Sequence, residues 1–200
     1  MFLIIFTGAP ASGKSSIAAK IAHEFNMPYY SKDDFKISLY EQYGFNNHDE
    51  KKKLSILGEK KLMEQIQLSI IQNKDVVVDN NFKDFREIKA MSEIEGSCKI
   101  ICINLIANPI LLAERYNQRI SSGNRHPALY TLDVYPIVEG VSTFHKPIDG
   151  NDVVRIQRNV TEETFGDYIF EINTDLIDTQ FDLIVTQIKD EIKNVWRNEK

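Results

Sequence analysis

The chain has 200 residues, of which 42% are hydrophobic and 26% charged, and 24 basic against 29 acidic side chains give a net charge of −5. These values exclude a disordered chain, a fibre and a disulfide-stapled mini-protein. The acidic balance disfavours a protein that coats nucleic acid through charge alone, although it is compatible with a local basic pocket.

The hydrophobic pattern predicts strands and helices that alternate along the chain. Apolar strands joined by short connections are typical of a parallel sheet covered by helices on both faces. The expected strands cover residues 2–7, 28–31, 75–79, 99–106 and 168–173, and the expected helices cover 14–25, 33–43, 49–73, 83–95, 109–120 and a terminal helix from Asp178. Residues 121–164 show little periodicity apart from 153–156, which predicts an irregular lid or substrate loop.

Two features of the sequence bear on the cellular compartment of the protein. Phe2–Phe6 is a five-residue apolar run with no basic segment before it, so we interpret it as a buried strand and not as a signal peptide. Cys98 and Cys102 lie on one face of a predicted strand, without a second Cys or His cluster that would complete a zinc site. We therefore expect two reduced core thiols and a cytoplasmic protein, with no run of the ~20 apolar residues that span a membrane.

The strongest motif is GAPASGKS, which matches the phosphate-binding pattern G-x4-G-K-[ST], or Walker A motif, between a predicted strand and a predicted helix. Its glycines let successive N–H groups point at a phosphate, and the helix N-terminus adds its positive end. Lys14 would reach the β- and γ-phosphates of ATP, and the Ser15 hydroxyl would bind Mg²⁺. The expected nucleotide-binding residues are Gly8, Ala9, Pro10, Ala11, Ser12, Gly13, Lys14, Ser15 and Ser16.

Other motifs in the sequence indicate which class of phosphate-loop protein this chain belongs to. A signalling GTPase would need the motifs D-x-x-G and [NT]-K-x-D, and neither occurs. An ATPase motor usually has a strand that ends Asp-Glu, whereas the matching strand here ends with Asp79 and Asn80. A kinase remains, in which the hydroxyl of an acceptor replaces water.

Asp33 and Asp34 follow the second strand, at the edge of the sheet where ligands bind in open α/β folds. One of these carboxylates would accept the proton of the acceptor hydroxyl. The alternative is that they cap the following helix, and a third interpretation gives one aspartate each role.

Arg115 and Arg119 lie four residues apart, so they share one face of the predicted helix 109–120, and Arg125 and His126 follow it. Cations beyond Lys14 would stabilise the charge that develops on the transferred phosphoryl group. The alternative is a solvated helix face, to which Glu114 and Gln118 would also belong.

Several segments together resemble the P-loop kinases that include polynucleotide 5′-kinase domains, zeta-type toxins and chloramphenicol phosphotransferase. These segments are GAPASGKS, SKDDFK, VVVDNNF with Arg86, and AERYNQR, within residues 1–130. The polynucleotide kinase domain is the closest in pattern. Similarity to nucleoside-monophosphate kinases further implies a three-layer P-loop fold with a lid and a five-stranded parallel sheet in the order 2-3-1-4-5.

The resemblance implies roles for individual residues. Asp33 would be the general base, Asp79 would lie near the acceptor or the metal, and Arg115 and Arg119 would be lid arginines. The residues implied in substrate binding are Asp34, Lys36, Asp79, Arg86 and Arg125. The group often has arginine where this chain has Lys36, and a lysine cannot make the planar two-pronged contact with phosphate, which weakens the expectation of a phosphorylated acceptor end.

We therefore predict a single P-loop kinase domain over residues 1–200, with a lid and acceptor insert at about 115–164. It would transfer the γ-phosphate of ATP, with Mg²⁺, to a hydroxyl of a small molecule, nucleotide or nucleotide sugar. The alternatives are a polynucleotide 5′-hydroxyl kinase and a non-catalytic nucleotide-binding regulatory protein. The expected partners are a nucleotide and a hydroxyl acceptor, with a nucleic-acid end among the candidates and no membrane.

Overall fold

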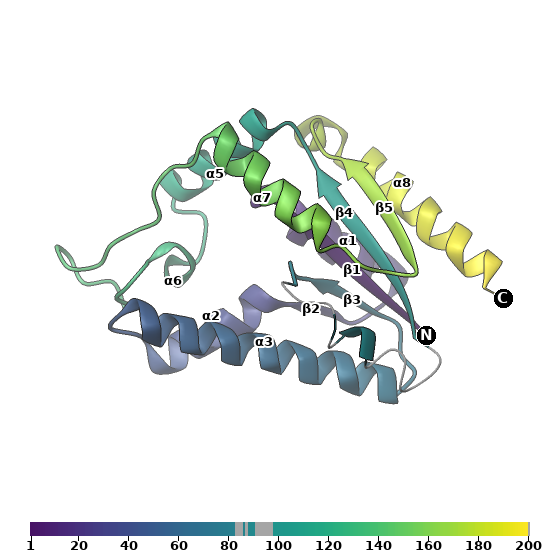
Figure 1. Ribbon diagram of the computed structural model, residues 1–200, viewed down its shortest axis with the longest axis horizontal. Coiled ribbons are helices and arrows are strands. Elements are labelled where there is room, and N and C mark those ends of the chain that lie inside the picture. Colours follow the sequence, from purple (N-terminus) through teal and green to yellow (C-terminus); the bar gives the residue numbers. More distant parts are fainter. Residues whose placement is uncertain (83–85, 87, 91–97, 200) are drawn as a thin grey trace.

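The computed structural model describes residues 1–82, 86, 88–90 and 98–199. Five parallel strands form one sheet in the order β2-β3-β1-β4-β5, which confirms the predicted order (Figure 1). The strands are β1 (Phe2–Gly8), β2 (Tyr29–Ser31), β3 (Val76–Asp79), β4 (Lys99–Ile106) and β5 (Tyr168–Asn173).

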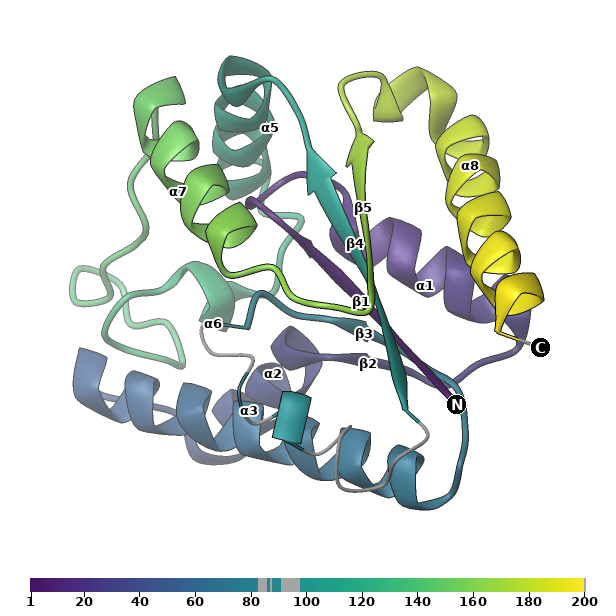
Figure 2. The ribbon, with the colours of Figure 1, turned by 45° about the vertical axis from the view of Figure 1, so that its right-hand side comes forward.

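Helices cover both faces of the sheet, with α1 and α8 on one side and α3 and α7 on the other (Figure 2). Successive residues of a strand point to opposite faces, so Ile4 and Phe6 pack beneath α1 while Leu3 and Ile5 pack beneath α3. Burial on both faces is why β1, β3 and β4 are largely apolar, whereas the edge strand β5 is partly exposed and carries Glu171. The helices are α1 (Lys14–Phe25), α2 (Lys32–Tyr43), α3 (His48–Ile71), α5 (Pro109–Ser121), α6 (Pro127–Tyr130), α7 (Gly150–Glu162) and α8 (Ile177–Asn198).

The segment 121–164 is less irregular than its sequence predicts, because it contains α6 and the 13-residue helix α7. A capping box starts α7: the Asp149 carboxylate accepts from the Asp152 backbone N–H at 2.9 Å, and the Asp152 carboxylate accepts in return at 3.2 Å. Val153 is the one described residue of α7 that is fully buried. Val153, Ile156 and Val160 follow helical spacing, so the periodicity recognised over 153–156 extends along this helix.

The remaining element predictions match closely, apart from boundary shifts of one or two residues. The terminal helix begins at Ile177, one residue before the predicted Asp178. The helix predicted over 83–95 lies mostly outside the described residues, although Arg86 and residues 88–90 are helical.

The two cysteines are buried and unpaired, as predicted, and both pack on the α3 face of the sheet. Burial raises the pKa of the Cys102 thiol to about 11, which keeps it protonated and unreactive near neutral pH. In the part of the chain that the structure describes, no helix combines the length and the apolar character needed to cross a membrane.

Candidate active site

The phosphate loop leaves the carboxyl end of β1 and curls tightly before α1. Gly8, Ala11 and Gly13 have positive φ values of 146°, 65° and 91°. At Gly8 a side chain is also excluded by space, since a Cβ would lie 2.5 Å from the Leu105 carbonyl oxygen. Gly13 supplies no capping side chain and the first turn of α1 holds no acid, which leaves its amides available to an anion.

Lys14 bends over this loop and donates a hydrogen bond to the Ala9 carbonyl at 3.1 Å. Burial lowers the pKa of Lys14, the negative charges of Asp79 and Asp33 oppose that shift, and the nearby Arg119 adds to it. The amine of Lys14 therefore stands where charges from three other elements act on it.

Ser15 and Asp79 form the polar contact between α1 and the end of β3. The Ser15 hydroxyl donates to the Asp79 carboxylate at 2.5 Å, and Asp79 is only 6% exposed. Burial raises the pKa of Asp79, and Lys14 and Ser15 partly offset the rise. A hydroxyl beside a carboxylate is the hard-oxygen donor set that Mg²⁺ prefers when phosphates complete its coordination. No cluster of three or more acidic, His or Cys ligands occurs among the described residues.

Asp33 lies in the first turn of α2 and binds two cations. Its carboxylate accepts from Lys36 at 2.9 Å and from Arg125 at 2.6 Å. Burial alone would raise its pKa, but the two cations lower the pKa of Asp33 to about 2, so it is ionised at neutral pH. The interpretation of Asp33 as a helix cap is wrong, because the Ser31 hydroxyl caps α2 by accepting from the Asp33 backbone N–H at 3.2 Å.

Asp34 differs from its neighbour in both exposure and charge environment. Its side chain is exposed, and the pKa of Asp34 is raised by partial desolvation and by the negative charges of Asp33 and Asp79. The choice of Asp33 as the base therefore stays a prediction, since the neighbouring carboxylate is the more basic of the two.

Arg115 and Arg119 have different surroundings although they share a helix face. Arg115 is held by the segment before α8, where it donates to the carbonyls of Thr174 and Asp175 at 3.1 and 2.7 Å and to the Asp178 carboxylate at 2.8 Å. The Arg119 guanidinium stacks 5.9 Å from the Tyr116 ring centroid, and its Nε is buried without a partner in the described structure.

The two arginines border a hollow of about 460 Å³ beside Gly13, Ser16 and Asp178. Neither arginine is fully exposed, and the choice between a role in phosphoryl transfer and a solvated helix face stays a prediction. Arg119 is the one whose charge lowers the pKa of Lys14, which puts it on the phosphate-loop side of the hollow.

The other predicted site residues do not all lie beside Asp33. Arg125 contacts Asp33 directly, whereas His126 pairs with Glu41 at 3.0 Å, away from the phosphate loop. Arg86 is helical and exposed, and its role in substrate binding stays a prediction.

Sequence reasoning missed two asparagines that follow β3. The Asn81 side chain accepts from the Gly8 backbone N–H at 3.0 Å and donates to the Gly8 carbonyl at 2.8 Å, so it holds the start of the phosphate loop from both sides. Asn80 is 6% exposed, and its amide nitrogen has no partner in the described structure. Their position directly after a buried strand, next to Asp79, was the available signal.

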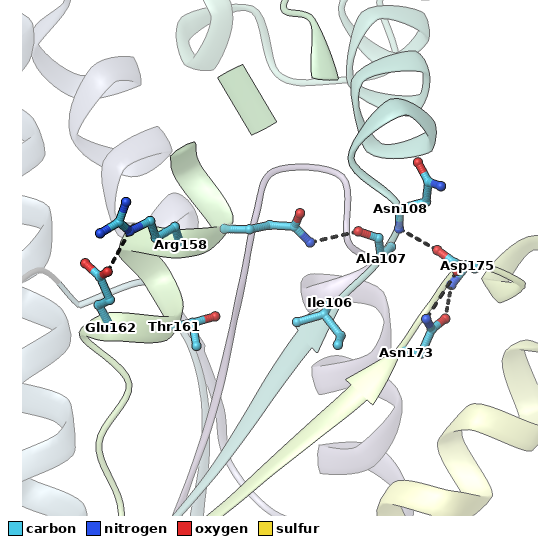
Figure 3. Close-up of a pocket in the computed structure, with 9 residues that line it drawn as sticks. Ile106, Ala107, Asn108, Arg158, Thr161, Glu162, Asn173 and Asp175 are labelled. Carbon is cyan, nitrogen blue, oxygen red and sulfur yellow. Dashed lines mark hydrogen bonds and ion pairs between the residues drawn. The ribbon is translucent and has the colours of Figure 1, made fainter. Parts of the chain in front are cut away.

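A larger hollow of about 680 Å³ lies between α7 and the carboxyl ends of β4 and β5 (Figure 3). Its polar groups bond to one another: Arg158 pairs with Glu162 at 2.7 Å, and the Asn108 backbone N–H donates to Asp175 at 2.6 Å. With these groups satisfied, this hollow is a weaker candidate site than the phosphate loop despite its size.

A family model described as "Chromatin associated protein KTI12" matches residues 1–117, which hold the phosphate loop, Asp33 and Asp79. The chain belongs to the KTI12 family. A search among curated proteins found no match.

Solved structures extend the fold likeness over nearly the whole chain. A Chloroflexus aurantiacus protein described as a "putative kinase" is 21% identical, with a TM-score of 0.72 over 94% of this chain and 96% of its own. The Bacteroides thetaiotaomicron shikimate kinase is 14% identical, with a TM-score of 0.53 over 96% of this chain and 98% of its own. The Sinorhizobium meliloti gluconokinase is 15% identical, with a TM-score of 0.52 over 98% and 97%.

These likenesses show that the KTI12-family chain has the fold of small-molecule P-loop kinases. Identities of this size carry the fold and not the substrate. The narrower resemblance to polynucleotide kinases and zeta-type toxins stays a prediction, because neither the family model nor these structures bear on it.

Proposed function

We propose that the protein is a kinase that transfers the γ-phosphate of ATP, with Mg²⁺, to a hydroxyl of a small molecule, nucleotide or nucleotide sugar. The observation that carries this proposal is the placement of Lys14 and the Ser15–Asp79 pair within electrostatic reach of Asp33. This arrangement supports a phosphate site and an acceptor-side carboxylate at one edge of the sheet, with the charge of Arg119 acting on Lys14.

Each of these residues would have a separate role in the reaction. The acceptor oxygen bonds to the γ-phosphorus while the bond to the β–γ bridging oxygen breaks, and ADP keeps that electron pair. The hydroxyl proton passes to the carboxylate of Asp33, and Lys14 and Arg119 stabilise the charge on the transferred group. Bound Mg²⁺, held by Ser15 and Asp79 with phosphate oxygens, would neutralise charge on the nucleotide.

A pKa of about 2 makes Asp33 a weak base while Lys36 and Arg125 hold it. Phosphoryl transfer passes through a loose transition state, in which orienting the acceptor matters more than removing its proton early. An acceptor that draws either cation away would also raise the pKa of Asp33 toward its ordinary value.

The test is transfer of label from γ-labelled ATP to a panel of hydroxyl acceptors that includes sugars, nucleosides, hydroxy acids and an oligonucleotide with a 5′-hydroxyl. We expect one acceptor class to be labelled by the native protein and by Lys20→Ala, an exposed control on the same helix, but not by Lys14→Ala. Native protein that binds no ATP would overturn the proposal. Labelling of the oligonucleotide alone would favour the polynucleotide kinase alternative.

A second candidate is a nucleotide-binding regulatory protein that does not turn over. The description of its family as chromatin-associated favours this candidate, as does the pairing of Asp33 with two cations. It predicts tight ATP binding without transfer to any acceptor, together with binding of a protein partner that differs between the ATP and ADP states.

A further inference from the structure

A group of three cations and one histidine from four segments gathers near Asp33. We call it the cation cluster; its members are Lys36 of α2, Lys51 of α3, Arg125 before α6, and His145 of the insert. Lys36 and Arg125 contact the Asp33 carboxylate directly. Lys51 and His145 were not singled out by sequence reasoning.

Lys51 is fixed in place by its surroundings. Its amine donates to the Thr131 carbonyl and lies 5.5 and 6.0 Å from the ring centroids of Phe45 and Tyr40. Burial, followed by the positive charges of Lys36 and Arg125, lowers the pKa of Lys51 to about 8, against the opposing effect of Asp33 and Asp133. The side chain is therefore half-buried beside like charges.

His145 places part of the insert beside the same group of charged side chains. Its backbone N–H donates to the Tyr130 carbonyl at 2.9 Å, and Thr131 and Phe144 form a bridge next to it, so the insert turns back on itself here. Burial lowers the pKa of His145, followed by the charges of Lys51, Arg125, Lys36 and His48. The cluster thus consists of side chains that meet only in the folded chain.

The cluster carries more positive charge than its contacts neutralise. Among the described residues, Lys36 and Arg125 contact one carboxylate, Asp33, whose charge also acts on Lys51, while the Asp133 carboxylate is engaged by the backbone and hydroxyl of Thr143 at 2.8 and 2.7 Å. Holding like charges together in a half-buried place is unfavourable unless an anion joins them. Perturbed groups of this kind, gathered beside a predicted catalytic carboxylate, are typical of a ligand site.

We propose that the cation cluster binds an anionic group, a phosphate or a carboxylate, carried by the acceptor alcohol. The inference rests on the proposed kinase function and names its substrate class: hydroxyl compounds with their own negative charge. The anion would take hydrogen bonds from Lys36, Lys51 and Arg125 and so place the hydroxyl against Asp33. It would also draw cations away from Asp33, leaving that carboxylate free to accept the proton.

This proposal modifies an expectation from the sequence. Lys36 stands where related kinases often have arginine, which weakened the expectation of a phosphorylated acceptor. Arg125 supplies a guanidinium on the opposite side of Asp33, and Lys51 supplies a second point charge. The neighbouring side chains therefore provide the guanidinium and the additional positive charge that Lys36 by itself does not supply.

The test uses inorganic phosphate as the probe, and acetate in a parallel arm, titrated calorimetrically into protein saturated with Mg·ADP so that the phosphate loop is occupied. We expect phosphate or acetate to bind, with an affinity about tenfold weaker in Lys51→Met, because a charge-assisted hydrogen bond contributes about that much. Lys52→Met, which removes the next, exposed lysine of α3, should bind as the native protein does. Lys51→Arg should restore binding, and melting curves would verify that each variant folds.

Two outcomes would overturn the proposal: no binding of either anion to the Mg·ADP-saturated protein, or equal affinities in Lys51→Met and Lys52→Met. Stronger binding of phosphate than acetate would identify the anion as a phosphate, and the reverse as a carboxylate. Failure of ADP to bind would instead contradict the proposed function. In that case the titration is repeated on Lys14→Ala, whose phosphate loop lacks its lysine, and still tests the cluster.

Discussion

The proposed donor and acceptor sides of the site are built in different ways. The donor side comes from the contiguous residues 8–16, joined by Asp79 and Asn81 at the end of the neighbouring strand. The acceptor side comes from α2, α3 and two places in the insert. A contiguous motif carries its chemistry in its own backbone, whereas a site assembled from distant segments exists only when the chain has folded.

The two sides also differ in charge balance. Lys14 on the donor side is opposed by the buried carboxylate of Asp79. On the acceptor side, Asp33 is the one carboxylate of the described residues that contacts cations of the cluster. The donor side is therefore suited to a ligand that brings its own Mg²⁺, and the acceptor side to a ligand that brings net negative charge.

Removing Lys14 tests the donor side and should have the largest effect. Lys14→Ala takes away the cation that would face the β- and γ-phosphates, so we expect phosphoryl transfer to fall by about 10²-fold or more. The effect is measured as kcat/KM for ATP with a confirmed acceptor. Unchanged kinetics, or a nucleotide-bound structure with its phosphates far from Gly13 and Ser15, would show that the donor side is elsewhere.

Removing the charge of Asp33 tests where the two sides meet. Asp33→Asn keeps the shape of the side chain and should lower the transfer rate by ~10²-fold while leaving ATP affinity almost intact. Asp34→Asn is the matched control. A collapse in the control with normal turnover in Asp33→Asn would assign the base to Asp34, and normal turnover in both would remove the pair from the chemistry.

The two arginines of α5 should differ in the effects of their substitution, just as they differ in their contacts. Arg119→Ala should lower the transfer rate about tenfold with a smaller effect on ATP affinity, since the charge that it stabilises is largest in the transition state. Arg115→Ala should mainly lower the free energy of unfolding, by about 1–3 kcal/mol, because it loses its bonds to Thr174, Asp175 and Asp178. Wild-type turnover in the double variant would exclude both from catalysis.

Asn81 supports the donor side from the neighbouring strand. Asn81→Leu loses both hydrogen bonds to Gly8, so we expect the free energy of unfolding to fall by about 1–2 kcal/mol. The affinity for ADP should weaken in parallel, because the loop is no longer held in its binding conformation. Normal stability and normal ADP affinity would show that the loop is held by other contacts.

The last prediction is a pH dependence from the acceptor side. Lys51 has a pKa of about 8 in the folded protein, below the usual value of 10.5, because of burial and the charges of Lys36 and Arg125. The unfolded chain therefore binds more protons between these two pH values, and the stability contributed at Lys51 rises as the pH increases from about 8 to 10.5.

This rise is measured as the difference in free energy of unfolding between the native protein and Lys51→Met across that pH range. Lys52→Met should follow the native protein, and added phosphate should reduce the difference by raising the pKa of Lys51. A flat difference would mean that the charges of the cluster do not act on Lys51.

Sequence patterns alone predicted most of the fold. The strands of the sheet were predictable because burial on both faces requires runs such as Val76–Asp79 and Lys99–Ile106 to be apolar. The order of the strands came from resemblance, since periodicity carries no information about which strands pair. Helix α7 was missed although Val153, Ile156 and Val160 follow helical spacing, because the segment around them was interpreted as irregular.

The phosphate loop was determined by the sequence itself, because its glycines, its lysine and the following helix lie within a few residues and act through local geometry. Only the tertiary structure decided that Arg115 binds the segment before α8 while Arg119 lies toward Lys14. It also decided that Lys51 and Arg125 gather around Asp33. The physical reason is that the contacts of these side chains join residues tens of positions apart in the sequence. Sequence spacing predicts neighbours only within one helix or strand, so it does not reveal such contacts.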